Sequence, residues 1–380
     1  MNRTSRVSGV LAAVGIVVAA ALIGATAAAL TGGSERKSSG TVAPIGETPS
    51  AKPSTPPKVT GPASVKLNPA KLKSGAAPSA PYLLNRKLVG DGPTVAIPGD
   101  GTVTAVVRSK ARTLVLLDLT DPSGGTELVS YDGAGKQLRR IPDVSDLYGS
   151  PDGRSAAWVQ HTVDEKGPVP GATLTFSDLA TGRNTVLDLP KDLIVVPIGI
   201  QDGVVLFVTA VKQAMQLHSW KVGDATATLI DKPTEEPILL SPDQRSLVER
   251  LGEGVIPDCD QLVNRADGTK LWQNCSWLVR EFSPDSRTVL TAPKNITQED
   301  RVAIFDVATG KLIRQWTVGT EALEATIYED DDHVLFTVAA DDRRIVRCTI
   351  SDGTCEQATK PVGIENFEDY EVLPRGGASA

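Results

Sequence analysis

The stretch DVATGK at residues 306–311 has a near copy, DLATGR, at residues 178–183. Each lies between two short runs of β-forming residues. An aspartate side chain can accept a hydrogen bond from an amide two residues on, and glycine tolerates a positive φ. We therefore predict two tight hairpin turns, whose turn-forming residues are Asp178, Gly182, Asp306 and Gly310.

A second turn motif precedes these hairpins. It reads SPDGR at residues 150–154, SPDQR at 241–245 and SPDSR at 283–287. Proline favours the second position of a turn, and the aspartate can bond the backbone that follows it. The predicted turn residues are Asp152, Asp243 and Asp285. Two alternating turns in each unit indicate units of four strands.

Both turn motifs recur along the chain in weaker copies. The hairpin turn has glycines at intervals of 41 to 47 residues, namely Gly92, Gly135, Gly182, Gly223, Gly268, Gly310 and Gly353. The second turn keeps the same step, around Lys110, Asp152, Asp202, Asp243, Asp285, Asp331 and Asp369. Four-stranded propeller blades repeat about every 40–45 residues. The sequence therefore predicts an all-β propeller.

The two ends of the repeat array complement one another. Residues 82–85 and 94–98 are typical of an outer hairpin with no inner strands before it. Residues 363–373 are typical of two inner strands with no outer hairpin after them. A shared blade would close the ring and cover the apolar faces that an open array exposes. We predict seven blades over residues 82–380, with six as the alternative if either terminal piece is only an appendage.

These turns resemble those of bacterial WD-repeat-like propellers, including the TolB-type repeats. The resemblance covers residues 82–373, although no Trp-Asp pair occurs and Lys110 replaces one turn aspartate. It implies the blade fold and, for propellers of this type, a role as an interaction platform. A periplasmic-type assembly or secretion accessory would be a further analogy with TolB-type proteins.

The N-terminal region predicts a membrane anchor and a linker. Residues 7–30 carry no charge, and this length suffices for a membrane-spanning helix. Arg3 and Arg6 favour residues 1–6 in the cytoplasm and the propeller outside. A cleaved signal, giving a secreted protein, is the alternative, because small residues suited to cleavage occur near residues 25–29. Residues 31–81 hold nine prolines after residue 43 and predict a disordered linker.

Charge limits the class of partner. Residues 1–81 have a net charge of +7, and residues 82–380 have 30 basic and 44 acidic residues, a net charge of −14. An acidic folded region argues against nucleic-acid binding, because neutralising phosphates supplies most of that affinity. We expect the partner to be an envelope or secreted protein or a cell-wall polymer, with membrane contact made by residues 7–30.

The four cysteines flank turns in pairs. Cys259 and Cys275 surround the turn at residues 267–268, and Cys348 and Cys355 surround the turn at 352–353. Three pairings are possible. Hairpin geometry favours the local one, because opposite residues on neighbouring strands come within disulfide distance. Free thiols remain the alternative, and the absence of a CxxC spacing disfavours zinc.

No motif for catalysis, metal binding or cofactor binding occurs. The three histidines, His161, His218 and His333, have no metal-ligand spacing, and no Gly-x-Ser-x-Gly elbow is present. A spatial Ser-His-Asp arrangement stays open. The acidic run at 329–332 fits a turn better than a calcium loop, which would need a glycine and a final glutamate at set positions.

The tryptophans and two long loops complete the candidates. The five tryptophans are expected to pack between sheets, or, if exposed, to anchor a partner: Trp158, Trp220, Trp272, Trp277 and Trp316. Loops at residues 164–171 and 293–301 are candidate recognition loops.

The predicted function is a non-catalytic binding platform. The alternative is a lyase, lactonase or cyclotransferase-like enzyme with its pocket in the central channel.

Overall fold

The computed structural model describes residues 59–372, except for residue 100 and the segments 120–124, 165–166, 191–192, 212–213, 232–234, 253–258, 295–299, 320, 340–341 and 364–369. Within these residues, no helix has the length and apolar character needed to cross a membrane. The predicted anchor at residues 7–30 and the linker up to residue 58 lie outside the described residues.

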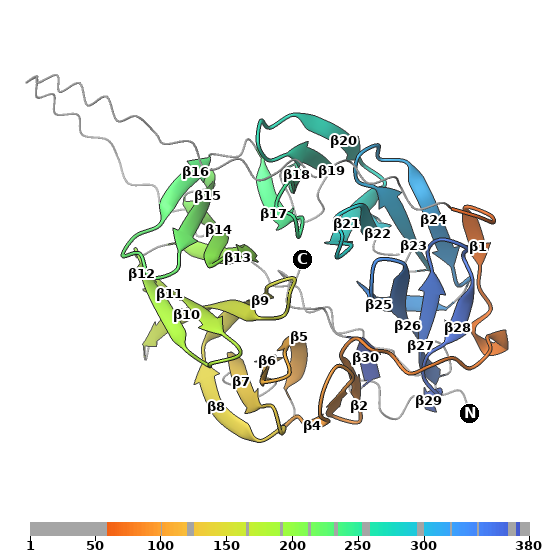
Figure 1. Ribbon diagram of the computed structural model, residues 1–380, viewed down its shortest axis with the longest axis horizontal. Helices are drawn as coiled ribbons and strands as arrows, with labels where there is room; N and C mark the ends of the chain where they lie inside the picture. The colour runs from red at the N-terminus through yellow and green to blue at the C-terminus, as the bar shows by residue number, and fades with distance from the viewer. Residues whose placement is uncertain are drawn as a thin grey trace, which may run out of the picture. The chain divides into compact units, whose positions relative to one another are not determined.

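Seven sheets stand in a ring around a central axis, so the predicted seven-bladed propeller is confirmed and the six-bladed alternative is wrong (Figure 1). Six blades are continuous in sequence. They are blade one, with β5 (Thr102–Arg108), β6 (Arg112–Asp118), β7 (Thr126–Asp132) and β8 (Gln137–Pro142); blade two, with β9 (Val144–Gly149), β10 (Ser155–Asp164), β11 (Gly167–Asp178) and β12 (Asn184–Leu189); and blade three, with β13 (Ile194–Gln201), β14 (Val204–Val211), β15 (Ala214–Lys221) and β16 (Thr228–Asp231).

The next three blades follow the same order from the axis outward. They are blade four, with β17 (Glu236–Leu240), β18 (Ser246–Leu251), β19 (Cys259–Asn264) and β20 (Lys270–Asn274); blade five, with β21 (Trp277–Phe282), β22 (Thr288–Pro293), β23 (Arg301–Asp306) and β24 (Leu312–Thr317); and blade six, with β25 (Ala322–Tyr328), β26 (His333–Ala339), β27 (Asp342–Thr349) and β28 (Cys355–Gln357).

The seventh blade joins the two ends of the propeller. Its sheet order is β30 (Tyr370–Val372), β2 (Tyr82–Leu84), β3 (Lys87–Val89) and β4 (Val95–Ala96). Strand β30 pairs antiparallel with β2, and Leu83 lies opposite Glu371. The predicted shared blade is therefore present.

The division of this blade differs from the prediction, because the N-terminal segment contributes three strands and the C-terminal segment contributes only β30. The strand that the sequence did not reveal, β3, follows a two-residue turn in which Asn85 and Arg86 have φ values of 50° and 54°. Two positive φ values suit a hairpin, but this turn carries no glycine to mark it. The short strand β29 (Val362–Gly363) pairs with β27 in blade six, and Asp369 lies outside the described residues.

Apolar burial follows the ring. Middle strands are continuous apolar runs, as in β6, because both of their faces meet a neighbouring blade. Outer strands such as β12 alternate between exposed and buried residues. Each of the seven seams between blades holds its own cluster of buried apolar side chains. At the seam between blades seven and one, Leu83, Leu88 and Val95 pack against Val106 and Val115.

Residues 59–80, which the sequence composition placed in the linker, lie against blades five to seven. Strand β1 (Ser64–Lys66) pairs parallel with β24, a single 3-10 turn, η1, spans Pro69–Lys71, and Ser74 forms a bridge with Gln357 of β28. We call these residues the N-terminal strap. The strap is ordered because Val65, Leu67 and Leu72 join the buried cluster around Trp316.

One buried arginine holds the start of the strap. Arg314 of β24 is fully buried, and its guanidinium donates hydrogen bonds to the carbonyl oxygens of Thr60 and Pro62 in the strap. It also donates to Ile350 and Ser351 in the last turn of blade six. A guanidinium has five donors in a rigid fork, so one side chain can join three segments.

We expect the closing blade to depend on the packing of Leu83. Leu83→Ala should lower the free energy of unfolding by about 2–5 kcal/mol, because the side chain is buried at the seam and its loss leaves a cavity. Urea titration followed by fluorescence measures the change. Leu138→Ala on β8 is the control, since Leu138 is exposed. Equal midpoints for the two variants would contradict the assignment.

The strap should depend on Arg314. Arg314→Met should lower the free energy of unfolding by about 3 kcal/mol, because buried carbonyl oxygens lose a charged donor. Hydrogen exchange should become faster at residues 60–67 than elsewhere. Lys311→Met, which changes an exposed residue of the same hairpin, should leave both measurements unchanged. Unaltered exchange in the Arg314 variant would show that the arginine does not hold the strap.

Candidate binding surface

The two repeated turn motifs lie on the same face of the ring. In every continuous blade, one turn joins the first and second strands and the other joins the third and fourth. Because successive strands are antiparallel, both turns leave the sheet at the same end. We call this the turn face. The opposite, loop face carries the connections between the second and third strands and those between blades.

The Ser-Pro-Asp turns have one repeated geometry. In each, the serine hydroxyl donates to the aspartate two residues on at 2.7 Å, as in the pairs Ser150–Asp152, Ser241–Asp243 and Ser283–Asp285. The same aspartate oxygen accepts the amide of the arginine that follows, at 3.0–3.1 Å. These carboxylates therefore hold the backbone of the turns through hydrogen bonds.

The hairpin turns are equally regular. The Asp178 carboxylate accepts the amides of Ala180 and Thr181 at 2.9 and 3.0 Å, and hydrogen bonding from the Thr181 amide lowers the pKa of Asp178. Gly182 has a φ of 70°. In blade five, Asp306 accepts the amide and the hydroxyl of Thr309.

Gly310 needs its lack of a side chain for two reasons. It has a φ of 64°, and a Cβ atom there would lie 2.6 Å from the ring of Trp272 in blade four. The Trp272 Nε1–H donates to the carbonyl of Val307 in the same turn, at 2.8 Å. The hairpin glycine thus also serves the contact between blades.

Hydrogen bonds join the first turns of blades four, five and six on the turn face. The Asp243 amide donates to the Ser286 hydroxyl of the next blade at 3.0 Å, and the Asp285 amide donates to the Asp331 carboxylate at 2.9 Å. Burial and repulsion from Asp285 raise the pKa of Asp331. Like charges are therefore held close together where blades five and six meet.

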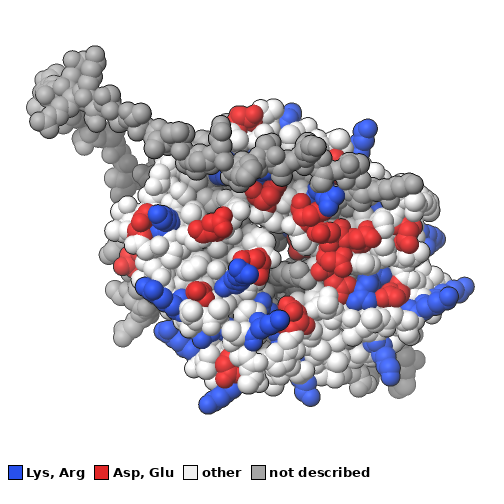
Figure 2. Space-filling model, viewed as in Figure 1, with Lys and Arg blue, Asp and Glu red and all other residues white. Residues whose placement is uncertain are grey.

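Acidic side chains gather over blades five and six, beside the hollow at the centre of the ring (Figure 2). Asp330 and Asp332 belong to the first turn of blade six, where their carboxylates accept amides of residues 332, 333 and 351. Within the described residues, no group of three or more His, Cys, Asp or Glu side chains is placed to hold a metal ion. The run at 329–332 lies in the turn between β25 (Ala322–Tyr328) and β26 (His333–Ala339).

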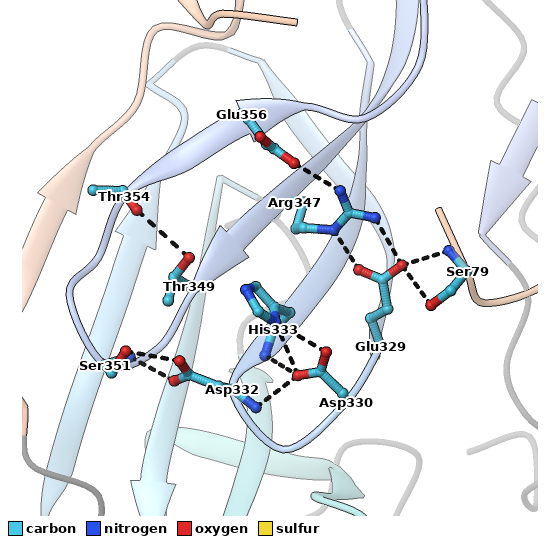
Figure 3. Close-up of polar contacts among 10 residues, drawn as sticks. All are labelled: Ser79, Glu329, Asp330, Asp332, His333, Arg347, Thr349, Ser351, Thr354 and Glu356. Atoms are coloured by element: carbon cyan, nitrogen blue, oxygen red, sulfur yellow. Dashed lines mark hydrogen bonds and ion pairs between the residues drawn. The ribbon is translucent and has the colours of Figure 1, made fainter. Parts of the chain in front are cut away.

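Glu329, the first residue of this turn, binds the end of the strap (Figure 3). We call its contacts with Ser79 and Arg347 the clasp. Its carboxylate accepts hydrogen bonds from the Ser79 hydroxyl at 2.8 Å and from both Nε and Nη2 of Arg347. Arg347 also donates to Glu356 at 2.7 Å and to the carbonyls of Ala76 and Ala77. Sequence reasoning missed this clasp, because nothing in the sequence places residues 76–79 beside blade six.

Among the described residues, the contacts of the three histidines do not make a Ser-His-Asp triad. His161 Nε2 lies 3.0 Å from the Ser145 hydroxyl, which donates to Asp146 at 2.6 Å. A triad needs its carboxylate on the imidazole, whereas here the carboxylate accepts from the serine. His218 lies 3.0 Å from the Thr209 hydroxyl and stacks on Phe207, and His333 bonds Asp330.

The tryptophans pack at the seams between blades. Three tryptophans are buried in the seams, Trp158, Trp220 and Trp316, and Trp272 and Trp277 pack half-buried against the seam between blades four and five. The prediction that the tryptophans pack between sheets is therefore confirmed.

The predicted local pairing of the cysteines is also confirmed, because the disulfides are Cys259–Cys275 and Cys348–Cys355.

The two predicted recognition loops both join a second strand to a third. The first was predicted too long, because β10 ends at Asp164 and β11 begins at Gly167, so residues 167–171 belong to a strand. The second lies between β22, which ends at Pro293, and β23, which begins at Arg301. Both therefore belong to the loop face, opposite the repeated turns. Residues 165–166, between β10 and β11, and residues 295–299, between β22 and β23, lie outside the described residues.

No protein-family model matches the chain, and no curated protein matches it. Solved propellers do resemble its fold. The β-propeller domain of the trilobed protease from Pyrococcus furiosus matches with a TM-score of 0.48 and 14% identity, over 70% of this chain and 86% of that one. An uncharacterized protein from Listeria monocytogenes EGD-e matches with a TM-score of 0.46 and 14% identity, over 70% and 85%.

TolB from Acinetobacter baumannii is also similar, with a TM-score of 0.43 and 16% identity, over 69% of this chain and 68% of that one. The seven sheets show the β-propeller fold, and TolB is among the chain's structural neighbours. At these identities the likeness concerns the fold alone.

The contacts of Glu329 predict that the stability of the fold depends on pH. Burial alone would raise the pKa of Glu329, but hydrogen bonds from Arg347 and Ser79 outweigh it and lower the pKa from 4.5 to about 2. A carboxylate whose pKa is lower in the folded state stabilises the fold above its unfolded pKa. This contribution should be lost as the pH falls from about 4.5 to about 2.

Glu329→Gln should therefore lower stability at pH 7 and reduce the difference between pH 7 and pH 3. Urea unfolding of both proteins at pH 7, 4.5 and 3 measures this. Asp224→Asn, at an exposed position, is the control. If the parent and the Gln variant lose the same stability between pH 7 and pH 3, Glu329 is not held as described.

Proposed function

We propose that the protein is a membrane-tethered, extracytoplasmic propeller that acts as a non-catalytic binding platform for a protein or a cell-envelope ligand. Residues 7–30 form its single membrane-spanning anchor, residues 1–6 lie in the cytoplasm, and the chain from residue 31 lies outside. The repeat motifs favour the WD-repeat-like class of bacterial propellers. Secretion after cleavage near residues 25–29 is the alternative.

The two disulfides are the observation that carries this location. Disulfides form and persist in oxidising compartments and are rare in the cytosol. Both bonds lie within single blades, Cys259–Cys275 in blade four and Cys348–Cys355 in blade six. The uncharged run before the propeller supplies a route to such a compartment.

The polar groups support binding rather than catalysis. The aspartates of the repeated turns are occupied in holding backbone amides, and the three histidines contact single hydroxyl or carboxylate partners. On the turn face, by contrast, hydrogen bonds join the first turns of blades four, five and six to one another. Rigid surfaces lose little conformational freedom when they bind.

The acidic patch over blades five and six favours a partner with basic side chains. Complementary charge speeds encounter and disfavours wrong partners more than it adds affinity. The Asp330 side chain, in the first turn of blade six, is 56% exposed, so a partner can reach its carboxylate. Both amides that Asp330 accepts bind the same oxygen, Oδ1. An Asp330→Asn substitution therefore removes the negative charge and keeps an oxygen that can accept these amides.

Affinity capture from envelope extract tests the proposal. The bait should span residues 55–380, which form one compact unit, because a bait starting at residue 82 would lack the strap. We expect a specific partner to be enriched, and Asp330→Asn combined with Asp331→Asn to reduce its capture at low salt. Asp224→Asn is the matched control. Capture of nothing above an empty-resin control would count against a binding platform.

Intact-mass measurement of the envelope-derived protein tests the tether. A mass that includes residues 1–30, recovered only with detergent, is the expected result. A soluble chain that begins near residue 30 would contradict the anchor and favour secretion.

A further inference from the structure

The innermost strands of the six continuous blades each contain an irregularity against the second strand. The register skips one residue in β5, β9, β13, β17 and β21, and two in β25. A bulge leaves its extra residue unpaired and can re-aim the side chain. In β21, Val279 lies opposite Thr291 and Glu281 opposite Leu290, so the extra residue is Arg280.

Arg280 is an unusual cation. Its strand borders the axis of the ring (Figure 1), and its side chain is exposed. Among the described residues, no hydrogen bond or ion pair engages it, although residues 82–380 hold 44 acidic side chains. Desolvation lowers the pKa of Arg280, and the neighbouring Arg250 lowers it further. An exposed side chain that is still partly desolvated is expected inside a channel.

Asp260, the acid that interacts electrostatically with Arg280, already has hydrogen-bond partners. Asp260 is fully buried; one carboxylate oxygen accepts the Val279 amide at 2.7 Å, and the other accepts Nε of Arg250 at 3.3 Å. Arg250 makes no further hydrogen bond through Nη2, which is enclosed. The Asp260 carboxylate interacts electrostatically with both Arg250 and Arg280, so these three groups leave a net charge of +1 between blades four and five.

We propose that Arg280, supported by Arg250, is a binding site in the central channel for a singly charged oxyanion, the carboxylate or phosphodiester group of a ligand. This inference rests on the proposed binding function and deepens it. The planar fork of an arginine matches both groups with two parallel hydrogen bonds. Arg280 makes the contact, while Arg250 holds Asp260 and adds to the local positive potential.

Calorimetric titration of the full chain in detergent, at constant ionic strength, tests the site. The probes are dimethyl phosphate for a phosphodiester and N-acetylglycine for a carboxylate, and the probe that binds identifies the group. We expect one saturable site for at least one probe. Arg280→Gln should weaken it about tenfold or more, because a charged hydrogen bond is lost.

Arg183→Gln, at an exposed arginine of a hairpin turn in blade two, should bind as the parent does. Arg280→Lys keeps the charge without the fork and should bind with intermediate affinity. The inference is overturned if neither probe saturates the parent, or if Arg280→Gln binds as tightly as the parent. It is also overturned if Arg183→Gln weakens binding equally. If a probe binds in the titration but affinity capture recovers no envelope partner, the proposed role as a binding platform is contradicted and the anion site is still supported.

Discussion

Each blade has two apolar faces, and only a neighbouring blade can cover them. This constraint sets the number of seams equal to the number of blades and requires the ring to close. Burying apolar surface is the main favourable term in folding, so a ring with one open seam would lose the contribution of two faces. Here the last seams are made with residues 82–96, and the last strand of the described chain, β30, completes the seventh sheet.

The closing blade is small, and other segments of the chain reinforce it. Strand β30 pairs with only three residues of β2. The strap that leads into β2 crosses blades five and six, where Arg314 and the Glu329–Arg347 clasp hold it. On the other side, Arg108 of blade one donates to the carbonyls of Gly90 and Pro93 in the closing blade. Arginines thus bind backbone carbonyls on both flanks of the shared blade.

Local signals let the sequence predict the repeat. Asp178, Gly182, Asp306 and Gly310 act through hydrogen bonds and φ values within a few residues, so their spacing revealed both the blade period and the turns. The hairpin disulfides followed from the same logic. Strand β3 was missed because its turn uses Asn85 and Arg86, neither of which signals a hairpin as strongly as glycine does.

The remaining features depend on long-range contacts. The strap has the composition of a linker, and only its contacts with Trp316 and Arg347 order it. The candidate anion site needs a bulge at Arg280 and the arrival of Arg250 and Asp260 from another blade. No spacing in the sequence predicts the order of the strap or the anion site, because the residues that contact each other lie far apart in the chain.

A designed disulfide across the closing strands tests ring closure most directly. Leu84 lies opposite Tyr370 in the pairing of β2 with β30, and opposite residues on antiparallel strands come within disulfide distance. In the double variant Leu84→Cys and Tyr370→Cys, we predict one intramolecular bond in addition to the two native ones, read by intact mass with and without reductant. Leu84→Cys with Val186→Cys should form none, because Val186 is exposed on β12, the outer strand of blade two. If the first pair stays reduced in the folded protein, or links only between molecules, the ring is not closed by these strands.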